Sequence, residues 1–292
     1  VSSGEGGFAG RLNYTRLGLD GGLDEWLRRG YATASTDTGH LSTDDRWAVG
    51  HPEKVIDYAY RSKHLVTMAA KGLIEAYYGR AATHSYFNSC SNGGRQALME
   101  VQRYPGDFDG VVVGAPWNYQ SHSNAGFVWS AQTLSATGAA IPPSKLPAIQ
   151  AAAVAACDAT DGLVDGLIEE PHRCAFEPES LRCTTVDSDD CLTGSQVASL
   201  EKLYSGPKHP RTGASIFPGW AIGSERGWER WVVADGVTNL GRTYFSNLVF
   251  EDLNWDYRTF DFDADLAFAE SKVGSLADAI ETDLSAAKQQ GV

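Results

Sequence analysis

The sequence predicts an α/β protein with a parallel β-sheet. A short strand at residues 84–88, which carries two adjacent aromatic side chains, precedes a helix at 96–104, and the valine-rich strand 111–113 follows. Upstream, apolar residues recur at helical spacing through 52–78. Strands that alternate with helices in this way pair in parallel through right-handed crossovers.

Local patterns place further elements. Residues 31–36 predict a buried strand, and the loop after it holds His40, which we interpret as a structural histidine rather than an active-site group. Pro52 opens the long helix, since proline fits the first helical turn, and Gly79 closes it. A last helix is predicted at 276–288. Four apolar residues share one face of it: Ala277, Ile280, Leu284 and Ala287.

Size and charge limit the class of protein. The chain has 292 residues, 42% of them hydrophobic, which suffices for one large domain or for a core with an insertion. No apolar run approaches the roughly 18–20 residues that a membrane span needs. The net charge of −13 argues against nucleic acid or an anionic membrane as a partner. The first residues show no signal peptide, which a mature secreted chain would have lost.

The rest of the chain is organised around Ser91, at the turn between a predicted strand and a predicted helix. Gly93 and Gly94 let the helix start close against the strand, and its first free N–H groups then point toward the serine. This context is typical of a nucleophile elbow, G-x-S-x-G, with Ser89 in place of the first glycine. Spacing alone leaves open a serine-rich loop without catalytic function.

A glycine-rich segment stands near the start of the chain, at residues 4–10. Such a loop can bring backbone N–H groups close to a ligand, because glycine carries no side chain to keep the backbone away. The segment lacks the pattern G-x-x-x-x-G-K-[ST], so a phosphate-binding loop is not indicated. A plain flexible loop is the alternative.

The sequence contains five cysteines, four of which cluster in a loop-rich stretch. No metal-binding spacing such as C-x-x-C occurs, so the close pairs indicate disulfides and an oxidising compartment. The local pairing joins Cys157 to Cys174 and Cys183 to Cys191, although spacing alone leaves other connectivities open. Cys90 is then left over. These features suit a secreted, extracellular enzyme.

An acidic loop forms a second candidate site. Asp158, Asp161 and Asp165 stand at offsets 0, 3 and 7, with glycines at positions 162 and 166. Such a loop can curl around one cation, and calcium prefers about six to eight oxygen ligands from carboxylates and carbonyls. The spacing and the lack of a final glutamate exclude an EF-hand. A solvated acidic turn is the alternative.

Three motifs carry a resemblance to a known family. They are the Cys90–Ser91 pair, the stretch 104–116 after the elbow helix, and residues 50–58 upstream. They resemble the tannase and feruloyl esterase family of α/β-hydrolases, and the resemblance runs over residues 4 to about 166 and more weakly to the end. It implies an α/β-hydrolase core with a large inserted lid domain, and the hydrolysis of esters of aromatic carboxylic acids.

The resemblance also implies roles for individual residues. The backbone amides of Asn92 and of Gly6 or Gly7 would form the oxyanion hole. A structural calcium would be held by five residues, through the side chains of Asp158, Asp161 and Asp165 and the carbonyls of Leu163 and Leu167. No organic cofactor is implied. A cysteine beside the catalytic histidine would pair with Cys90, and we expect that partner beyond Val292.

Three parts make up the expected organisation. Residues 1–116 form the N-terminal part of the hydrolase core, 117–258 a lid with the Ala-rich helix 146–156 and the calcium loop, and 259–292 an incomplete return to the core. In this fold the order is serine, acid, histidine, yet no histidine lies beyond His209. We therefore expect the catalytic acid and histidine on a missing C-terminal segment or chain, unless this is an inactive fragment.

The resulting hypothesis is a secreted serine carboxylic-ester hydrolase that forms an acyl-enzyme on Ser91. Its substrates would be aromatic acid esters of the feruloyl or galloyl type. Two alternatives stay open. One is a related hydrolase of other aromatic esters, such as terephthalate monoesters, and the other is a catalytically silent, calcium-stabilised binding module on the same fold. The lid geometry, rather than any sequence motif, decides the preferred acyl group.

Overall fold

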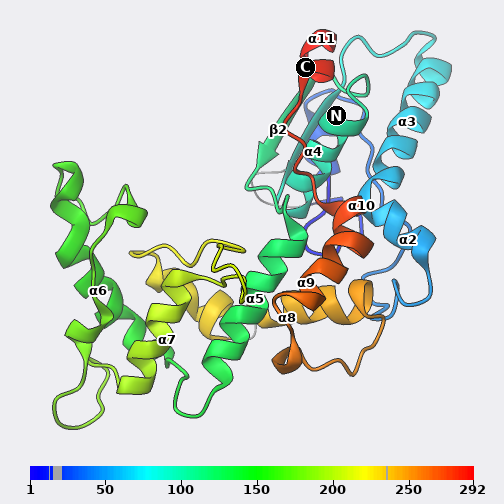
Figure 1. Ribbon diagram of the computed structural model, residues 1–292. Coiled ribbons are helices and arrows are strands. Elements are labelled where there is room, and N and C mark those ends of the chain that lie inside the picture. The colour runs from blue at the N-terminus through cyan, green and yellow to red at the C-terminus, as the bar shows by residue number, and fades with distance from the viewer. Residues whose placement is uncertain (13, 16–21, 235) are drawn as a thin grey trace. The chain divides into compact units, whose positions relative to one another are not determined.

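The computed structural model describes residues 1–12, 14–15, 22–234 and 236–292 (Figure 1). The chain forms two compact units. Unit 1 consists of Val1–Ser121, Ser246–Leu253 and Phe268–Val292, and unit 2 of His122–Phe245 and Asn254–Ala267. Unit 1 contains the sheet and the elbow serine, whereas unit 2 contains the acidic loop and both disulfides.

Two parallel strands form the sheet of unit 1. β1 (Tyr86–Cys90) pairs with β2 (Gly110–Gly114), with the first residues of the two strands opposite each other and likewise the last. The helix α4 (Asn92–Arg103) connects the strands and packs against both of them (Figure 1). The predicted strand–helix–strand order and the parallel pairing are confirmed.

A small apolar cluster joins α4 to the sheet. Phe87 of β1, Ala97 of α4 and Phe108, which precedes β2, are buried together, and Val111 and Val113 pack against them. The rings of Phe87 and Phe108 meet edge to face at 5.3 Å, a favourable geometry for aromatic pairs. The alternate valines of β2 reach this cluster because successive side chains of a strand point to opposite faces.

The strand predicted at 31–36 is reduced to a single bridge. Ser2 bridges in parallel to Ala34 on one side and to Phe87 on the other, and the Ala34 amide donates to the Val1 carbonyl oxygen at 3.2 Å. The prediction of a full strand is wrong. Among the described residues, its partner segment offers one bridging residue before the chain turns into the glycine-rich loop, so no ladder can extend.

The long predicted helix is present, with one irregular turn inside it. α2 (Pro52–Ile56) and α3 (Ser62–Tyr78) are joined by the π-helical turn η1 (Asp57–Arg61). Gly79 ends the helix with φ of 67°, and its amide donates to the Glu75 carbonyl oxygen at 2.9 Å. A left-handed terminal residue of this kind favours glycine, so the predicted helix end is confirmed.

The helix predicted at 276–288 is wrong. α10 (Ser275–Ala277) ends before Asp278, and α11 (Ser285–Gln290) begins after a non-helical segment. The Asp278 carboxylate accepts hydrogen bonds from the backbone amide (3.0 Å) and the hydroxyl (2.5 Å) of Ser121. This contact fixes Asp278 with ψ of 115°, which is extended rather than helical. The apolar spacing of the segment does not reveal such a tertiary contact.

The remaining elements are helical. In chain order they are α1 (Leu23–Arg28), α5 (Gln120–Ser135), η2 (Pro143–Lys145), η3 (Asp158–Asp161), η4 (Pro171–Arg173), η5 (Pro178–Leu181), η6 (Glu225–Gly227), η7 (Glu229–Val233), α8 (Gly236–Thr243), η8 (Tyr244–Val249), η9 (Tyr257–Thr259), α9 (Ala264–Ala269) and η10 (Glu270–Gly274). Among the described helices, none combines the length and the hydrophobicity that a membrane span requires.

Unit 2 has a core of its own. α6 (Leu146–Cys157), which matches the predicted Ala-rich helix, and α7 (Gly194–Ser205) bury apolar side chains around Trp228, which is 2% exposed. Two disulfides close loops beside this core, Cys157–Cys174 and Cys183–Cys191. Both local pairings suggested by the sequence are therefore present. Each closed loop restricts the unfolded chain and so stabilises the unit.

Candidate active site

Ser91 lies at the turn between β1 and α4 in a strained backbone conformation. Its φ of 63° and ψ of −126° form a combination that residues other than glycine avoid unless their surroundings impose it. Its amide donates to the Gly114 carbonyl oxygen at 3.0 Å, and its carbonyl accepts from the amides of Arg95 (3.1 Å) and Trp117 (3.0 Å). The side chain is exposed. This is the geometry of a nucleophile elbow.

Three glycines allow the backbone to crowd around this turn. A Cβ atom on Gly93 would lie 2.0 Å from Ser89 Oγ, and one on Gly94 would lie 2.5 Å from the Gly114 carbonyl oxygen. A Cβ atom on Gly4 would lie 2.6 Å from the Cα atom of Gly93. No side chain fits at these positions, so the helix starts against the strand as the sequence predicts.

The glycine-rich loop is held beside the start of α4 by two side chains. Asn92 donates through Nδ2 to the Glu5 carbonyl oxygen at 3.0 Å, and Gln96 accepts from the Glu5 amide through Oε1 at 3.2 Å. Within the described chain, the backbone amides of Asn92, Gly6 and Gly7 have no hydrogen-bond acceptor. The structure therefore brings together the loop and the helix start that carry the three candidate oxyanion-hole amides.

His40 anchors the far side of the same loop. Its Nε2 atom lies 2.9 Å from the Phe8 carbonyl oxygen, and its ring stacks on Trp47 at 3.8 Å. Because a carbonyl oxygen accepts only, Nε2 carries the proton of the neutral ring. Burial lowers the pKa of His40 and favours this neutral form. These contacts support the interpretation of His40 as a structural residue.

Arg95 is the site residue that sequence reasoning missed. It is fully buried, and its Nε atom donates to Asn92 Oδ1 at 2.8 Å. Its two terminal nitrogens donate to the carbonyl oxygens of Ala59 (2.7 Å) and Tyr58 (3.0 Å), which belong to the π-helical turn η1. Arg95 thus orients the Asn92 side chain that holds the glycine-rich loop. Its position directly after the two glycines of the elbow is the one sequence signal for this role.

Among the described residues of unit 1, no hydrogen bond joins Ser91 to a histidine. His40 is bonded to the Phe8 carbonyl, and His64 Nδ1 lies 2.7 Å from Asp107 Oδ2. Cys90, at the end of β1, is half-buried and carries a free thiol. His40 and His64 are therefore engaged by other groups and do not supply the base that a serine nucleophile needs.

The acidic loop of unit 2 is curled on itself. Asp158 is 7% exposed, and its carboxylate accepts from the backbone amides of Asp165 (3.3 Å) and Gly166 (3.1 Å). Gly162 and Gly166 have φ of 94° and 85°, so both reversals of the chain need glycine. The curl brings the ends of the acidic segment together.

The oxygen ligands of this loop are of the type that a hard cation takes, although its three carboxylates do not form one of the described groups whose ligand atoms lie within 4.8 Å of one another. Asp161 accepts from the Leu163 amide at 2.9 Å, and Asp165 accepts from the Leu167 amide at 3.1 Å. The side chains of Leu163 and Leu167 are 63% and 68% exposed, so these residues contribute to the loop through their backbone. Carboxylate and carbonyl oxygens are the ligands that calcium prefers.

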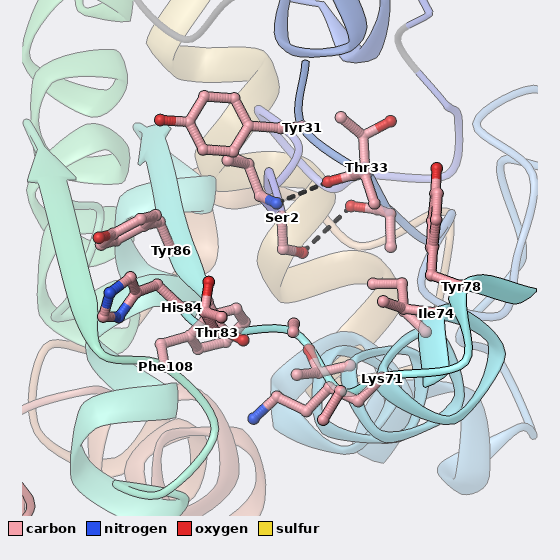
Figure 2. Close-up of a pocket in the computed structure, with 18 of the residues that line it drawn as sticks. Ser2, Tyr31, Thr33, Lys71, Ile74, Tyr78, Thr83, His84, Tyr86 and Phe108 are labelled. Atoms are coloured by element: carbon pink, nitrogen blue, oxygen red, sulfur yellow. Dashed lines mark hydrogen bonds between the residues drawn. The ribbon is translucent and has the colours of Figure 1, made fainter. Parts of the chain in front are cut away.

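A pocket of about 450 Å³ lies at the other end of β1 from Ser91 (Figure 2). Tyr31, Tyr78 and Tyr86 contribute aromatic side chains to its wall, and Lys71 contributes an ammonium group. Ser91 does not line it. A strand rises about 3.3 Å per residue, so the five residues of β1 separate this pocket from Ser91 by roughly 16 Å. The pocket is therefore not part of the elbow.

Comparison with known proteins agrees with the family resemblance of the sequence motifs and extends it over residues 1–291. The family model described as "Tannase and feruloyl esterase" matches residues 1–291. An uncharacterized esterase of Xanthomonas campestris is 39% identical over 298 residues, covering 95% of this chain and 51% of that protein. A probable feruloyl esterase B-1 of Aspergillus terreus is 32% identical over 279 residues, covering 93% of this chain and 51% of that protein.

The fold comparison agrees. The solved structure of feruloyl esterase B from Aspergillus oryzae superposes with a TM-score of 0.85 at 29% identity, covering 99% of this chain and 57% of that one. The predicted α/β-hydrolase fold is therefore confirmed. The chain spans about half the length of the relatives it matches.

Proposed function

Since this chain belongs to the tannase and feruloyl esterase family, we propose that it is part of a serine carboxylic-ester hydrolase in which Ser91 is the nucleophile. The observation that carries the proposal is the strained backbone of Ser91, an exposed serine between β1 and α4. Strain of this kind persists at functional sites, where it holds a reactive group clear of the backbone. Ser91 Oγ attacks the ester carbonyl, the alcohol leaves, and water releases the acid from the acyl-enzyme.

The negative charge that develops on the carbonyl oxygen needs hydrogen-bond donors. The amide of Asn92 at the start of α4 is one candidate, and the amide of Gly6 or Gly7 is the other. Contacts around Glu5 support this assignment, because Asn92 and Gln96 hold the glycine-rich loop against the same helix. Donors fixed in advance stabilise an oxyanion more than water does, since they need no reorganisation.

A histidine must accept the Ser91 proton, and an acid must orient that histidine. Both are proposed to lie in sequence outside this chain. The proposal also pairs Cys90 with a cysteine beyond Val292, next to that histidine. Support comes from the free thiol of Cys90 directly before Ser91 and from the other contacts of His40 and His64 in unit 1.

The proposed substrates are esters of aromatic acids, of the feruloyl or galloyl type. Relatives named feruloyl esterase support this class. Aromatic side chains flank the elbow as well: the rings of Phe8 and Trp117 meet edge to face at 5.4 Å, and the Trp117 amide donates to the Ser91 carbonyl oxygen. A planar acyl group can stack on such rings.

Calcium and secretion complete the proposal. The loop of residues 158–167 would hold a structural calcium through the side chains of three aspartates and the carbonyls of Leu163 and Leu167. The ion would stabilise unit 2 and takes no part in the ester chemistry. The two disulfides support an extracellular, oxidising compartment.

The test is burst kinetics with methyl ferulate and methyl gallate on the complete protein. Ser91→Ala should abolish acyl-enzyme formation and leave the fold intact. Ser89→Ala is the matched control, because it also removes a serine hydroxyl, two residues before Ser91. The Ser89 hydroxyl is buried and has no hydrogen-bond partner among the described residues. Acylation retained in Ser91→Ala would refute the nucleophile. A complete wild-type protein that never acylates would favour the silent binding module.

A further inference from the structure

Three metal-ligating side chains meet in unit 1, at the end of α4 remote from Ser91. They are His64 of α3, Glu100 of α4 and Asp107 of the loop before β2, and their ligand atoms all lie within 4.8 Å of one another. Glu100 follows Ser91 by nine residues, or ~14 Å along a helix. The cluster is therefore separate from the proposed ester chemistry.

Glu100 is the unusual member of this cluster. It is 1% exposed, and apart from the neighbouring Asp107 carboxyl group its carboxylate oxygens have no hydrogen-bond partner among the described residues. Burial raises the pKa of Glu100 to about 9, and a hydrogen bond with Asp107 and the charge of that carboxylate add to the effect. A carboxyl group buried with another carboxyl group beside it is costly to ionise, and a bound cation would compensate both charges.

A proton shared between Glu100 and Asp107 is the alternative to a cation at this cluster. A side-chain hydrogen bond with Asp107 contributes to the raised pKa of Glu100, so the two carboxyl groups share a proton in the metal-free protein, and binding of a cation would displace that proton. An ion that binds ligands at about 2.0–2.2 Å holds them up to about 4 Å apart. The observed group needs to close by less than about 1 Å to bind one.

Two lysines near Glu100 do not take the place of this cation. Lys63 donates through Nζ to the Ser3 carbonyl oxygen at 2.6 Å and lies over the Phe87 ring at 5.3 Å. Lys71 Nζ lies 3.4 Å from the Gly106 carbonyl oxygen. Their positive charges reduce the repulsion between the carboxylates, but neither lysine is hydrogen-bonded to Glu100.

We propose that His64, Glu100 and Asp107 form a zinc-binding site, with water as the remaining ligand. One imidazole and two carboxylates are ligands that Zn²⁺ takes, and a set of three protein ligands leaves one coordination position for water. The His64 ring is held by its stack on Tyr104 at 3.9 Å, and its side chain is 29% exposed, which gives the ion a route in. The ion ties α3, α4 and the loop before β2 together.

The experiment is a calorimetric Zn²⁺ titration of the complete, chelator-treated protein with calcium held in excess to occupy the acidic loop. One zinc should bind per chain. His64→Gln and Glu100→Gln should each weaken the affinity at least ~10-fold, the loss typical of disturbing even the surroundings of a metal ligand. The matched controls His84→Gln and Glu75→Gln change exposed residues and should bind as the wild type does.

The proposal can be tested even if a variant fails to fold, because the wild-type protein alone can refute it. Zn²⁺ should protect His64, identified by peptide mass spectrometry, from modification by diethyl pyrocarbonate. The proposal is overturned by a wild type that binds no zinc, by zinc that leaves His64 unprotected, or by folded His64→Gln and Glu100→Gln variants that bind zinc unchanged. Asp158→Asn should leave the zinc titration as it is, which separates this site from the acidic loop.

Discussion

Asn92 donates a hydrogen bond through its side-chain amide to the carbonyl oxygen of Glu5, at 3.0 Å. This bond joins the first residue of the elbow helix to the loop that carries Gly6 and Gly7. Arg95 in turn donates to Asn92 Oδ1 at 2.8 Å, so the Asn92 side chain has a fixed orientation. The relative position of the candidate oxyanion-hole amides therefore depends on buried polar side chains as well as on the sheet.

The close approach at Gly93 predicts a large steric effect. In Gly93→Ala, the new methyl group meets Ser89 Oγ at 2.0 Å and Ser89 Cβ at 2.8 Å, so the free energy of unfolding should fall by about 1–3 kcal/mol or more. Urea denaturation of the complete protein measures it. Gly72→Ala is the control, since open space surrounds this exposed glycine of α3, and it should be neutral or stabilise by up to ~1 kcal/mol. Equal stability of both variants would contradict the packing.

We expect His40 to contribute to the loss of folding stability at acidic pH. Burial lowers the pKa of His40 below its ordinary value of 6.5, so the unfolded chain binds this proton before the folded chain does. The stability that His40 contributes is present above about pH 6.5 and is lost as pH falls toward the lowered pKa. Melting temperatures between pH 8 and pH 5 should fall less steeply in His40→Gln than in the wild type or in His84→Gln. Three parallel curves would show that His40 is not the sensitive group.

The acidic loop predicts a calcium-dependent stability of unit 2. Calcium at about 100 times its dissociation constant should stabilise the folded protein by ~2.7 kcal/mol, seen as a higher melting temperature than in chelator. Asp158→Asn should remove most of this difference, since Asp158 is the buried carboxylate of the loop. The exposed Asp190→Asn makes the same chemical change outside the loop and should retain it. A melting curve unaffected by calcium in the wild type would refute the site.

Sequence reasoning succeeded where neighbouring residues determine the structure. The Ser91 turn follows from a strand, two glycines and a helix in direct succession, and Gly79 ends its helix through its own backbone. Arg95 was missed because its acceptors are distant in sequence: Ala59 lies 36 residues away and Ala277 lies 182 away. No periodicity can report such contacts.

Both wrong predictions have the same physical origin. The helix expected at 276–288 is broken where Asp278 binds Ser121, which is 157 residues earlier. The strand expected at 31–36 has suitable residues, but in the described chain Ser2 alone bridges to it. In both cases the local pattern was present, and a tertiary partner decided the outcome.

Cys90 predicts a covalent link to sequence outside this chain. A free thiol beside a reactive serine would be prone to oxidation in an oxidising compartment, whereas a disulfide there would tie the elbow to the segment with the catalytic base. Non-reducing mass spectrometry of the complete native protein should recover the Cys90 peptide joined to a histidine-containing peptide that is absent from this sequence. Recovery of Cys90 as a free thiol would remove this part of the proposal.

The most direct test of Ser91 as nucleophile is covalent labelling with a fluorophosphonate, followed by peptide mapping. The reagent reacts with serines that a base has activated, and it requires no knowledge of the natural substrate. The complete protein should gain one adduct, located on Ser91, and Ser91→Ala should gain none while Ser89→Ala is labelled as the wild type is. A folded, complete protein that takes up no label, or takes it up at a serine other than Ser91, would contradict the proposed function.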